Sequence, residues 1–355
     1  MTSADILPRI GAEFIMRLAY FPFAAYYKIV ILYDNIPAQQ APAENEVKGM
    51  QHSTAQLDDY RYLSLKGSRE IGSGKRGTAF RLKSGEIVKV FHDNSTLEQI
   101  REERDRADLA WQLGVPSVRT YDVVATGKGY GIVFESGGDI ELGTYMSQHP
   151  ESLEEYMGRF AAMVRQVHAA QAPDGVFLNY KERYKRDLSG LTEYFTAREI
   201  RSLLEIVDAI PTRNTLVHGD CHPQNVMRSE ADGKLRFIDL ADFGCGHPIF
   251  DVGGLGLLIY NAKGNDASAR EILGMPGTQC MEMWHVFLRL YYQTEDAEFL
   301  KRMEKTCAYF GTLRMAQLMS STIKLKKTEK LIMAMLIRFR LLLHKREAQR
   351  LFSQL

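Results

Sequence analysis

Short runs of apolar residues, bounded by glycine and serine, follow one another from Tyr60 onwards. YRYLSLKGSREIG, TAFRLKS and EIVKVFH are rich in β-branched and aromatic residues, which is typical of strands. After a longer run with helical spacing come YDVVATG and YGIVFES, and Lys128-Gly129 between them predicts a hairpin. The pattern therefore predicts three strands, one helix and two further strands, in that order.

The helix of this region is the run LEQIREERDRADLAWQL, in which apolar residues recur at helical spacing. Asn94-Ser95 offers its N-terminal cap, because Glu98 stands at the capping-box spacing from Ser95. Gly114 and Pro116 are predicted to end it.

From residue 137 onwards the spacing of apolar residues is mostly helical. Residues 153–170 and 198–210 predict amphipathic helices, and Gly137-Gly138 before them is interpreted as a hinge. A further helix is predicted near Val252, with Asp251 as its N-terminal cap in a structural role.

Residues 14–33 are apolar and aromatic but are interrupted by Arg17, Pro22 and Lys28. A membrane-spanning helix needs about 20 mostly apolar residues, and each central charge costs roughly 2.5–3.5 kcal/mol. We therefore interpret this segment as a helix packed on the protein or as an appendage, followed by a linker over residues 36–56. A translation start at Met50 is a further hypothesis, which the intact mass of protein made from the native gene would test.

Composition narrows the class of protein. The chain has 355 residues, with 45 Lys and Arg against 44 Asp and Glu, and 45% of its residues are hydrophobic. This is ordinary globular composition and excludes a disordered or collagen-like chain. The net charge of +1 argues against nucleic-acid binding by a generally basic surface. The four cysteines form no C-x-x-C pair and fit a reducing cytoplasm.

A glycine-rich segment, Gly72-Ser73-Gly74-Lys75-Arg76-Gly77, lies between two of the predicted strands. A G-x-G-x-x-G pattern flanked by strands suits a hairpin that covers nucleotide phosphates, whereas a plain glycine turn is the alternative. Lys89 stands twelve residues after Gly77, inside an apolar strand, where it would pair with a phosphate or point to solvent. Of the two glutamates on the next helix, Glu103 is preferred over Glu102 as the ion-pair partner of Lys89.

The most informative stretch is LVHGDCHPQNV, residues 216–226, in which apolar residues flank a cluster of His, Asp and Asn. Burial of such groups is costly unless they are paired or hold a ligand. If Asp232-Gly233 forms the centre of a hairpin turn, Asn225 faces position 240, and Asp239 lies one rung away. Asn225, Asp239 and Asp220 would then converge, and their oxygens suit Mg²⁺.

Three neighbouring residues receive other interpretations. The triplet Asp242-Phe243-Gly244 matches the magnesium motif of protein kinases, but the hairpin register places it beyond the point of convergence, so Asp242 is only the fallback ligand. His222 has no second His or Cys at zinc spacing and is interpreted as a hydrogen-bonding residue of the loop. Cys221 is interpreted as a packing residue.

At these residues the sequence resembles the aminoglycoside phosphotransferase and choline kinase family of small-molecule kinases. The pattern His218-Gly219-Asp220-x-His222-Pro223-x-Asn225, followed by Phe237-Ile238-Asp239, carries the resemblance. The glycine-rich loop, the lysine and the helix glutamate recur in the expected order, and residues 60–260 are covered well.

The resemblance implies a role for each residue of this pattern. Asp220 would orient the acceptor hydroxyl and accept its proton, while His218 supports the loop. Asn225 and Asp239 would hold Mg²⁺ on the nucleotide phosphates.

On the nucleotide side, the resemblance implies that Lys89 contacts the α and β phosphates and pairs with Glu103. The segment from Glu135 to Gly138 would face the adenine. Three glycines would let backbone N–H groups approach the phosphates: Gly72, Gly74 and Gly77.

The implied architecture is a protein-kinase-like, two-lobed α+β fold. Residues 1–59 would be an apolar extension and linker, residues 60–136 a small antiparallel β lobe with one helix that binds the nucleotide, and residues 137–355 a mainly helical catalytic lobe. The implied enzyme is a cytoplasmic kinase that uses ATP, with GTP as the alternative nucleotide, and Mg²⁺. Its partner would be a small hydroxylated molecule, and its oligomeric state is left open.

Three alternatives are kept. A protein kinase is disfavoured because Gly219 stands where the H-R-D motif has Arg, and no A-P-E follows. A catalytically inactive regulatory protein would lack the lysine, aspartate or asparagine, all of which are present. A membrane-associated protein would use the aromatic N-terminal segment and a basic C-terminal region.

The acceptor is narrowed by the charges after Gly311. The cationic residues there face only Glu329 and Glu347, and polycationic aminoglycosides are usually met by acidic groups. A sugar, an amino alcohol or another hydroxylated metabolite is therefore at least as plausible an acceptor as an aminoglycoside, although a solvated helix face is the simpler interpretation of these charges. The cationic residues are Arg314, Lys324, Lys326, Lys327, Lys330, Arg338, Arg340, Lys345, Arg346 and Arg350.

Overall fold

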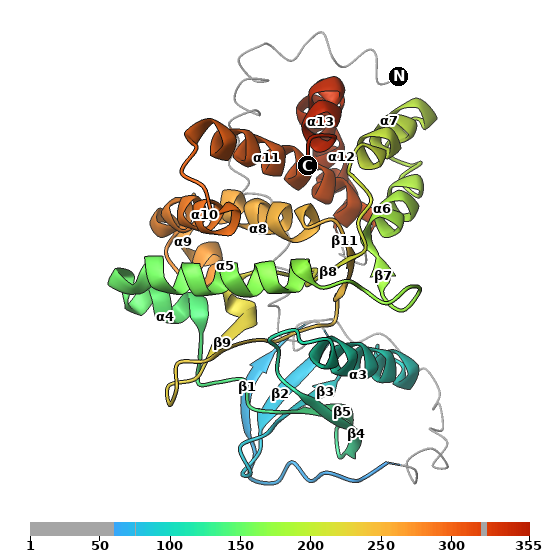
Figure 1. Cartoon of the computed structure of the whole chain (residues 1–355). Helices are drawn as coiled ribbons and strands as arrows, with labels where there is room; N and C mark the ends of the chain where they lie inside the picture. Colours follow the sequence, from blue (N-terminus) through green and yellow to red (C-terminus); the bar gives the residue numbers. More distant parts are fainter. Residues whose placement is uncertain (1–59, 75, 321–324) are drawn as a thin grey trace, which may run out of the picture. The chain divides into compact units, whose positions relative to one another are not determined.

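A computed structural model describes residues 60–74, 76–320 and 325–355. The described residues form two compact units. The sheet unit comprises residues 60–141 together with Asn225–Phe243, and the helical unit comprises Leu142–Gln224 together with Gly244–Leu355. Figure 1 shows the elements of both units.

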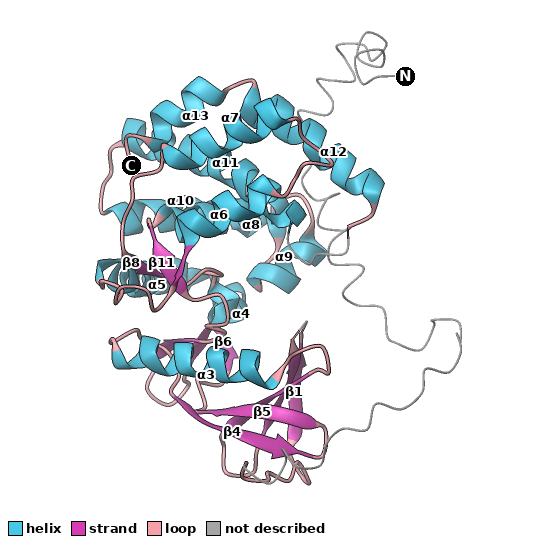
Figure 2. Cartoon of the chain, turned by 90° about the vertical axis from the view of Figure 1, so that its right-hand side faces the viewer, coloured by secondary structure: helices cyan, strands magenta, loops and turns pink. Residues whose placement is uncertain are grey.

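The sheet unit is built on a five-stranded antiparallel sheet with strand order β1-β2-β3-β5-β4. Helix α3 lies against β4 and β5 (Figure 2). The predicted order of three strands, one helix and two strands is confirmed. The elements are β1 (Arg69–Ser73), β2 (Gly77–Arg81), β3 (Ile87–Phe91), α3 (Leu97–Gln112), β4 (Thr120–Thr126) and β5 (Gly129–Phe134).

Alternation along β3 decides where Lys89 points. Val88 and Val90 enter one core cluster, whereas Phe91 enters a second cluster with Ile100 of α3. Because successive side chains of a strand face opposite sides of the sheet, Lys89 shares the side of Phe91, and that side is covered by α3. The sequence EIVKVFH therefore places a lysine beneath a helix.

Helix α3 begins at Leu97, the first residue of the predicted run, but its N-cap lies one residue later than predicted. Its N-cap is Thr96, in extended conformation, and Thr96 forms a capping box with Gln99. The predicted cap, Ser95, was wrong, because glutamine serves the box as well as glutamate does. Gly114 follows the helix with φ 83°, a left-handed conformation that favours glycine.

A second small sheet in this unit has the order β10-β9-β6 and contains the predicted hairpin. Its strands are β6 (Ile140–Glu141), β9 (Val226–Arg228) and β10 (Leu235–Phe237). The predicted hairpin register was wrong by two residues: the loop closes between Ser229 and Lys234, and Asn225 pairs with Ile238 instead of Leu240. Gly233, with φ 65°, is part of this longer loop rather than the centre of a two-residue turn.

Gly137 and Gly138 are required by close packing within the sheet unit. A Cβ atom at Gly137 would lie 2.8 Å from Val118, and one at Gly138 would lie 2.6 Å from the backbone of Arg228. The chain leaves the sheet unit three residues further on, after Glu141.

The helical unit consists of helices around α8, which runs through its middle and packs on α9, α10 and α11 (Figure 1). Glycine in α8 permits this packing, since a Cβ atom at Gly253 would lie 2.3 Å from the ring of Phe310. A short sheet of order β7-β11-β8 completes the unit. Its elements are α4 (Leu142–Gln148), η5 (Pro150–Ser152), α5 (Leu153–Ala169), β7 (Leu178–Asn179), α6 (Tyr180–Ser189), α7 (Ala197–Asp208), β8 (Thr215–Val217), β11 (Gly244–Gly246), α8 (Ile249–Ala262), α9 (Asp266–Leu273), α10 (Gly277–Tyr292), α11 (Ala297–Ser320), α12 (Lys327–Ile337), η7 (Arg338–Leu342) and α13 (Lys345–Phe352).

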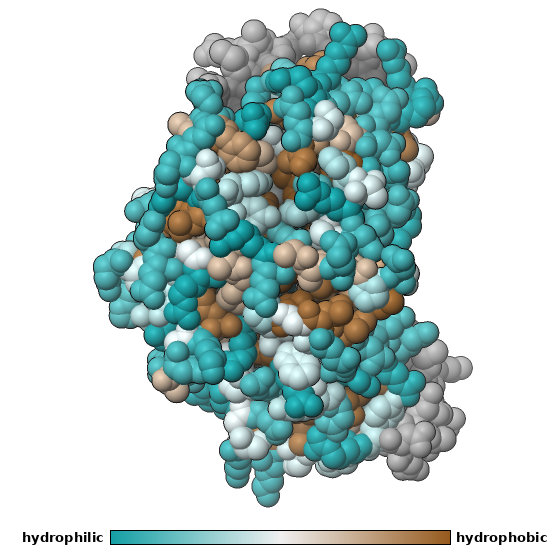
Figure 3. Space-filling view, in the orientation of Figure 1, coloured by the Kyte–Doolittle hydropathy of each residue, from teal (hydrophilic) through white to brown (hydrophobic). Residues whose placement is uncertain are grey.

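Part of the basic C-terminal region is neutralised by acidic side chains in and before α7. Lys327 lies 3.1 Å from Glu193, Arg338 lies 2.6 Å from Glu199, and Lys345 pairs with Glu205. Hydrophilic side chains cover most of the face seen in Figure 3, with apolar ones scattered between them. These charges therefore support the interpretation of a solvated, ion-paired surface.

Across the described ranges, no helix is long and apolar enough to span a membrane. The apolar segment of residues 14–33 and the candidate start at Met50 lie outside the described residues.

Candidate active site

The structure pairs Lys89 with Glu103, the glutamate chosen from the sequence. Nζ of Lys89 lies 2.9 Å from Oε1 of Glu103, which is buried on α3, whereas Glu102 is exposed. Burial alone would lower the pKa of Lys89, but attraction by Asp239 and Glu103 outweighs it and raises that pKa. Lys89 is therefore a fixed, charged ammonium.

Arg76 is a cation of this cluster that sequence reasoning missed. Its Nη1 lies 3.2 Å from Glu103 and its Nη2 lies 3.9 Å from Asp242. Burial opposes the charge of Arg76, but Asp242 and Glu103 raise its pKa. Its position inside the glycine-rich segment is the sequence feature that could have identified Arg76 as a residue of the site.

The glycine-rich segment is a turn between β1 and β2, as predicted, closed by a hydrogen bond from the N–H of Gly74 to the carbonyl of Gly77. The three glycines differ in what they allow. Cβ atoms at Gly72 and Gly74 would meet nothing within 4 Å, whereas one at Gly77 would lie 2.3 Å from the carbonyl oxygen of Val90. Packing on β3 thus requires Gly77, and open space surrounds the other two.

Asn225 and Asp239 lie on neighbouring rungs, even though the predicted register was wrong. The carbonyl of Asn225 accepts a hydrogen bond of 2.9 Å from the N–H of Ile238, the residue before Asp239. Asp239 has φ 54°, unusual for a residue other than glycine, and its Oδ1 lies 3.4 Å from Nζ of Lys89. Asp242, in contrast, faces Arg76.

This pair of oxygen ligands fits Mg²⁺. Mg²⁺ is usually bound by one or two carboxylates, with substrate phosphates and water completing its shell. Within the described ranges, no group of three or more His, Cys, Asp or Glu side chains is placed to hold a metal. An Asp and an Asn could hold a hard cation that is shared with a nucleotide, but they do not suit zinc.

Glu135 lies immediately after β5 and its side chain is engaged within the sheet unit. One carboxylate oxygen accepts a hydrogen bond of 3.3 Å from the N–H of Arg119, and the other lies 3.8 Å from Arg236.

In the helical unit, residues 218–222, called the Asp220 loop, follow β8 and are held by Asp251. One carboxylate oxygen of Asp251 accepts a hydrogen bond of 2.7 Å from the backbone N–H of His218, and the other accepts one of 2.7 Å from the backbone N–H of Gly219. Gly219 has φ 86°, which favours glycine. The predicted cap role of Asp251 was wrong: Pro248 holds the N-cap position of α8, and Asp251 lies within the first turn.

A buried chain of hydrogen bonds supports Asp251. Nε2 of His168 on α5 lies 3.0 Å from the Asp251 carboxylate and donates to it, since an ionised carboxylate only accepts. The hydroxyl of Tyr291 on α10 lies 2.7 Å from Nδ1 of the same histidine. Burial would raise the pKa of Asp251, but His168 and His218 lower it. Sequence reasoning missed His168 and Tyr291.

Asp220 is half-buried and surrounded by groups that favour its ionised form. Burial alone would raise its pKa, but His222, Arg314 and His218 together lower it. Nε2 of His222 lies 3.5 Å from Oδ2 of Asp220, and the N–H of Asp220 donates to Nδ1 of His218 at 3.4 Å. Both histidines therefore shape the loop around an ionised carboxylate.

Cys221 is buried beside Asp220, and burial raises its pKa well above the usual value of 9.0. A thiol that stays protonated is a poor nucleophile, which agrees with its interpretation as a packing residue.

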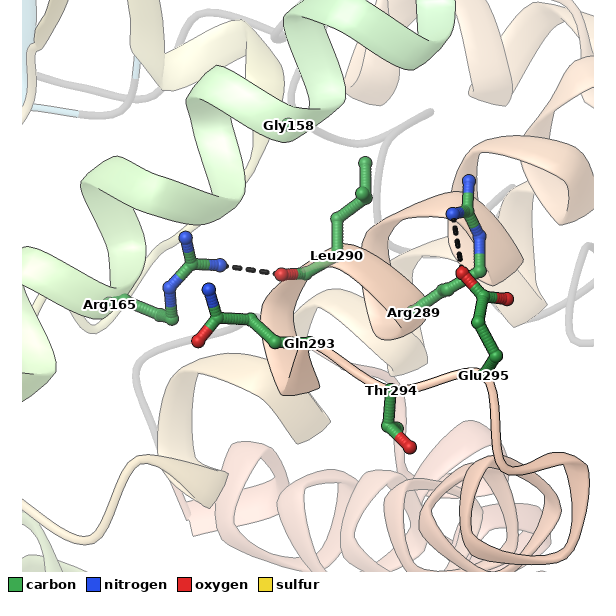
Figure 4. Close-up of a pocket in the computed structure, with 7 residues that line it drawn as sticks. All are labelled: Gly158, Arg165, Arg289, Leu290, Gln293, Thr294 and Glu295. Carbon is green, nitrogen blue, oxygen red and sulfur yellow. Dashed lines mark hydrogen bonds and ion pairs between the residues drawn. The ribbon is translucent and has the colours of Figure 1, made fainter.

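A cavity of about 350 Å³ lies elsewhere in the helical unit, between α5 and the end of α10 (Figure 4). Its charges are already satisfied, because Arg165 donates to the carbonyl of Leu290 and Arg289 pairs with Glu295 at 2.9 Å. Its lining residues are Gly158, Arg165, Arg289, Leu290, Gln293, Thr294 and Glu295, so it holds none of the predicted site residues.

The sequence match defines this chain as a phosphotransferase, and its fold is protein-kinase-like. Residues 68–284, more than half of the chain, match the sequence model of the phosphotransferase enzyme family, and the chain belongs to that family. A search of curated proteins finds no match.

Solved structures of similar fold include aminoglycoside phosphotransferase APH(2'')-Ib bound to ADP, with 17% identity and a TM-score of 0.50 over 81% of this chain and 93% of that one. A ternary complex of APH(2")-IIa with streptomycin and ATP has 17% identity and a TM-score of 0.50 over 78% and 92%. Ethanolamine kinase of Plasmodium vivax has 11% identity and a TM-score of 0.50 over 77% and 84%. These likenesses show the fold.

Proposed function

We propose that this phosphotransferase transfers the γ-phosphate of ATP to a hydroxyl group of a small molecule, with Mg²⁺ and with Asp220 as the base. The observation that carries the proposal is the position of Lys89, whose ammonium lies 2.9 Å from Glu103 and 3.4 Å from Asp239. A lysine fixed by a helix glutamate next to a metal-ligand carboxylate is the arrangement that phosphoryl transfer by kinases uses.

On the nucleotide side, Lys89 would contact the α and β phosphates, and the open backbone at Gly72 and Gly74 would let N–H groups approach them. Asn225 and Asp239 would hold Mg²⁺, which when bound neutralises charge on the phosphates. The segment that starts at Glu135 would face the base of the nucleotide, and GTP is the alternative donor.

On the acceptor side, Asp220 would accept a hydrogen bond from the attacking hydroxyl and take its proton. The oxygen then forms the new bond to the γ phosphorus, and the bond from that phosphorus to the bridging oxygen breaks, leaving ADP. Asp251 holds the backbone before Asp220 through two hydrogen bonds of 2.7 Å, so the carboxylate is positioned in advance. His218 and His222 keep this carboxylate ionised.

A small acceptor is favoured over a protein. Gly219 replaces the arginine of the protein-kinase H-R-D motif, and only eleven residues separate Asp239 from Asp251, which leaves no room for an activation loop. We place the enzyme in the cytoplasm, and residues 60–136 and 137–355 are the proposed nucleotide-binding and catalytic lobes.

The test is a screen for ATP-dependent phosphorylation over sugars, amino alcohols, nucleosides, hydroxy acids and aminoglycosides. We expect one class to be phosphorylated and the turnover to be lost in Asp220→Ala, while Asp105→Ala, on an exposed aspartate of α3, serves as the control. Phosphorylation that persists in Asp220→Ala would overturn the role of Asp220, and no phosphorylation of any class would overturn the proposal.

A further inference from the structure

Arg314, on α11, lies beside the Asp220 loop. Its Nη2 donates to the carbonyl of Gly219 at 3.4 Å, and its Nη1 donates to the hydroxyl of Tyr184 at 3.3 Å. The position is defined by packing, because Tyr184 on α6 is fully buried and α11 packs on α6. A cation from a helix 95 residues later in the chain thus contacts the residue directly before Asp220.

The charge of Arg314 acts on Asp220. Among the described residues, its two hydrogen-bond acceptors are the Gly219 carbonyl and the Tyr184 hydroxyl, and both are uncharged. Burial would lower the pKa of Arg314, but its contacts with Tyr184 and Tyr180 and its attraction to Asp220 raise it. The two hydrogen bonds use two of the five N–H groups that a guanidinium offers.

The charged groups near Arg314 and Asp220 do not cancel the positive charge of Arg314. His222 and His218 act on Asp220 in the same direction as Arg314 does. One turn along α6 and α11, Asp187 is held by Gln317 at 2.7 Å and by Arg183 at 3.7 Å. Asp251 is engaged by the backbone of the loop and by His168. Of the described carboxylates near Arg314, Asp187 and Asp251 are therefore already paired with other groups.

We infer that the acceptor is a hydroxylated anion, which carries a carboxylate or a phosphate near its reacting hydroxyl, and that Arg314 binds this group. This inference rests on the proposed function, since it requires the acceptor hydroxyl to contact Asp220. A substituent only a few bonds from that hydroxyl then lies within Coulomb range of the guanidinium. An ammonium is repelled there, whereas a carboxylate or a phosphate matches the planar fork of an arginine.

The experiment measures kcat/KM for matched acceptors that differ in charge. One set is glycerate, glycerol and serinol, and a second is gluconate, glucose and glucosamine; glycerol phosphate and glucose phosphate separate phosphate from carboxylate. We expect the wild-type enzyme to prefer an anionic member. Arg314→Gln should lower kcat/KM for that member roughly 10- to 100-fold more than for the neutral member, because both members lose the contact of Arg314 with the Asp220 loop and only the anion loses its charge partner.

Two further variants separate charge recognition from folding. Arg314→Lys keeps the charge and should keep the preference for the anion over the cation, even if the glutamine variant is unstable. Arg302→Gln, on an exposed arginine of the same helix, should change nothing.

The outcomes are distinct. A preference of the wild-type enzyme for the ammonium member, or an equal loss for all members in Arg314→Gln, overturns the inference and leaves the proposed function standing, provided that turnover needs Asp220. If no acceptor in any set is phosphorylated, the proposed function fails and the inference fails with it.

Discussion

The carboxylate of Asp251 accepts a hydrogen bond of 2.7 Å from the backbone N–H of Gly219, so α8 fixes the residue directly before Asp220. The other oxygen of the same carboxylate accepts from the N–H of His218. Because both oxygens are used as acceptors, an amide NH₂ in place of either oxygen would face at least one N–H donor and lose its hydrogen bond. Asp251 is therefore a positioning residue for the Asp220 loop.

The first prediction concerns Asp251→Asn. We expect the variant to lose about 3–5 kcal/mol of unfolding free energy, as for a broken buried ionic contact, and to lose most of its kcat. Chemical unfolding and steady-state kinetics measure the two effects. Asp105→Asn, on an exposed aspartate of α3, is the control and should change stability by less than about 0.5 kcal/mol. Wild-type turnover in Asp251→Asn would show that the Asp220 loop keeps its conformation without the carboxylate of Asp251.

The second prediction uses the adjacent glutamates of α3. Glu103→Gln removes the negative charge that lies 2.9 Å from Lys89. Glu102→Gln is the same chemical change on an exposed side chain. A hydrogen bond to a charged group contributes about 1.5–3 kcal/mol, so kcat/KM for ATP should fall roughly 10- to 150-fold in the first variant only. Equal effects in both variants would contradict the pairing as a functional contact.

The third prediction separates two aspartates that sequence motifs confuse. Asp239 faces Lys89 at 3.4 Å, whereas Asp242 faces Arg76 at 3.9 Å. Asp239→Asn should raise the Mg²⁺ concentration needed for half-maximal activity and lower the maximal rate by at least about 100-fold, because it removes a carboxylate ligand. Asp242→Asn should retain the Mg²⁺ dependence of the wild type. The reverse pattern in a magnesium titration would assign the metal to Asp242.

Contacts that depend on local periodicity could be predicted from the sequence. The alternation in EIVKVFH and the helical spacing of the next run predict the strand and the helix, and the resemblance to small-molecule kinases predicts that Lys89 pairs with Glu103. The hairpin register could not be fixed in this way. Two-residue and longer loops are both compatible with the segment around Gly233, and each loop length implies a different set of paired residues.

Contacts between distant segments had no local signal. Asp251 lies 32 residues after Gly219, and Arg314 lies 95 residues after it. An acidic residue at the start of a helix is most often a cap, and a cation on a long amphipathic helix is most often solvated, so sequence reasoning assigned Asp251 to a helix cap and Arg314 to a solvated face. Only the packing of α8 and α11 brings them to the Asp220 loop.

A buried histidine at the end of β11 gives the protein a pH-dependent stability. His247 is 5% exposed, and its Nδ1 accepts a hydrogen bond of 3.1 Å from the N–H of Ile249. Burial lowers its pKa from 6.5 to about 4, with a further contribution from the cationic Arg213 and from His168. The folded protein therefore holds this ring neutral, and protonation of Nδ1 would break the hydrogen bond.

The fourth prediction follows from the sign of this shift. Above pH 6.5 both the folded and the unfolded chain carry a neutral His247, and its contribution to stability is fully present. As the pH falls from 6.5 towards 4, the unfolded chain takes up the proton first, so stability falls by at most about 1.4 kcal/mol per pH unit. His247→Asn keeps an acceptor for Ile249 and does not titrate, so its unfolding free energy should fall less between pH 7 and pH 5. Urea unfolding measures these free energies. If the wild type and His247→Asn lose the same unfolding free energy between pH 7 and pH 5, another group causes the acid sensitivity.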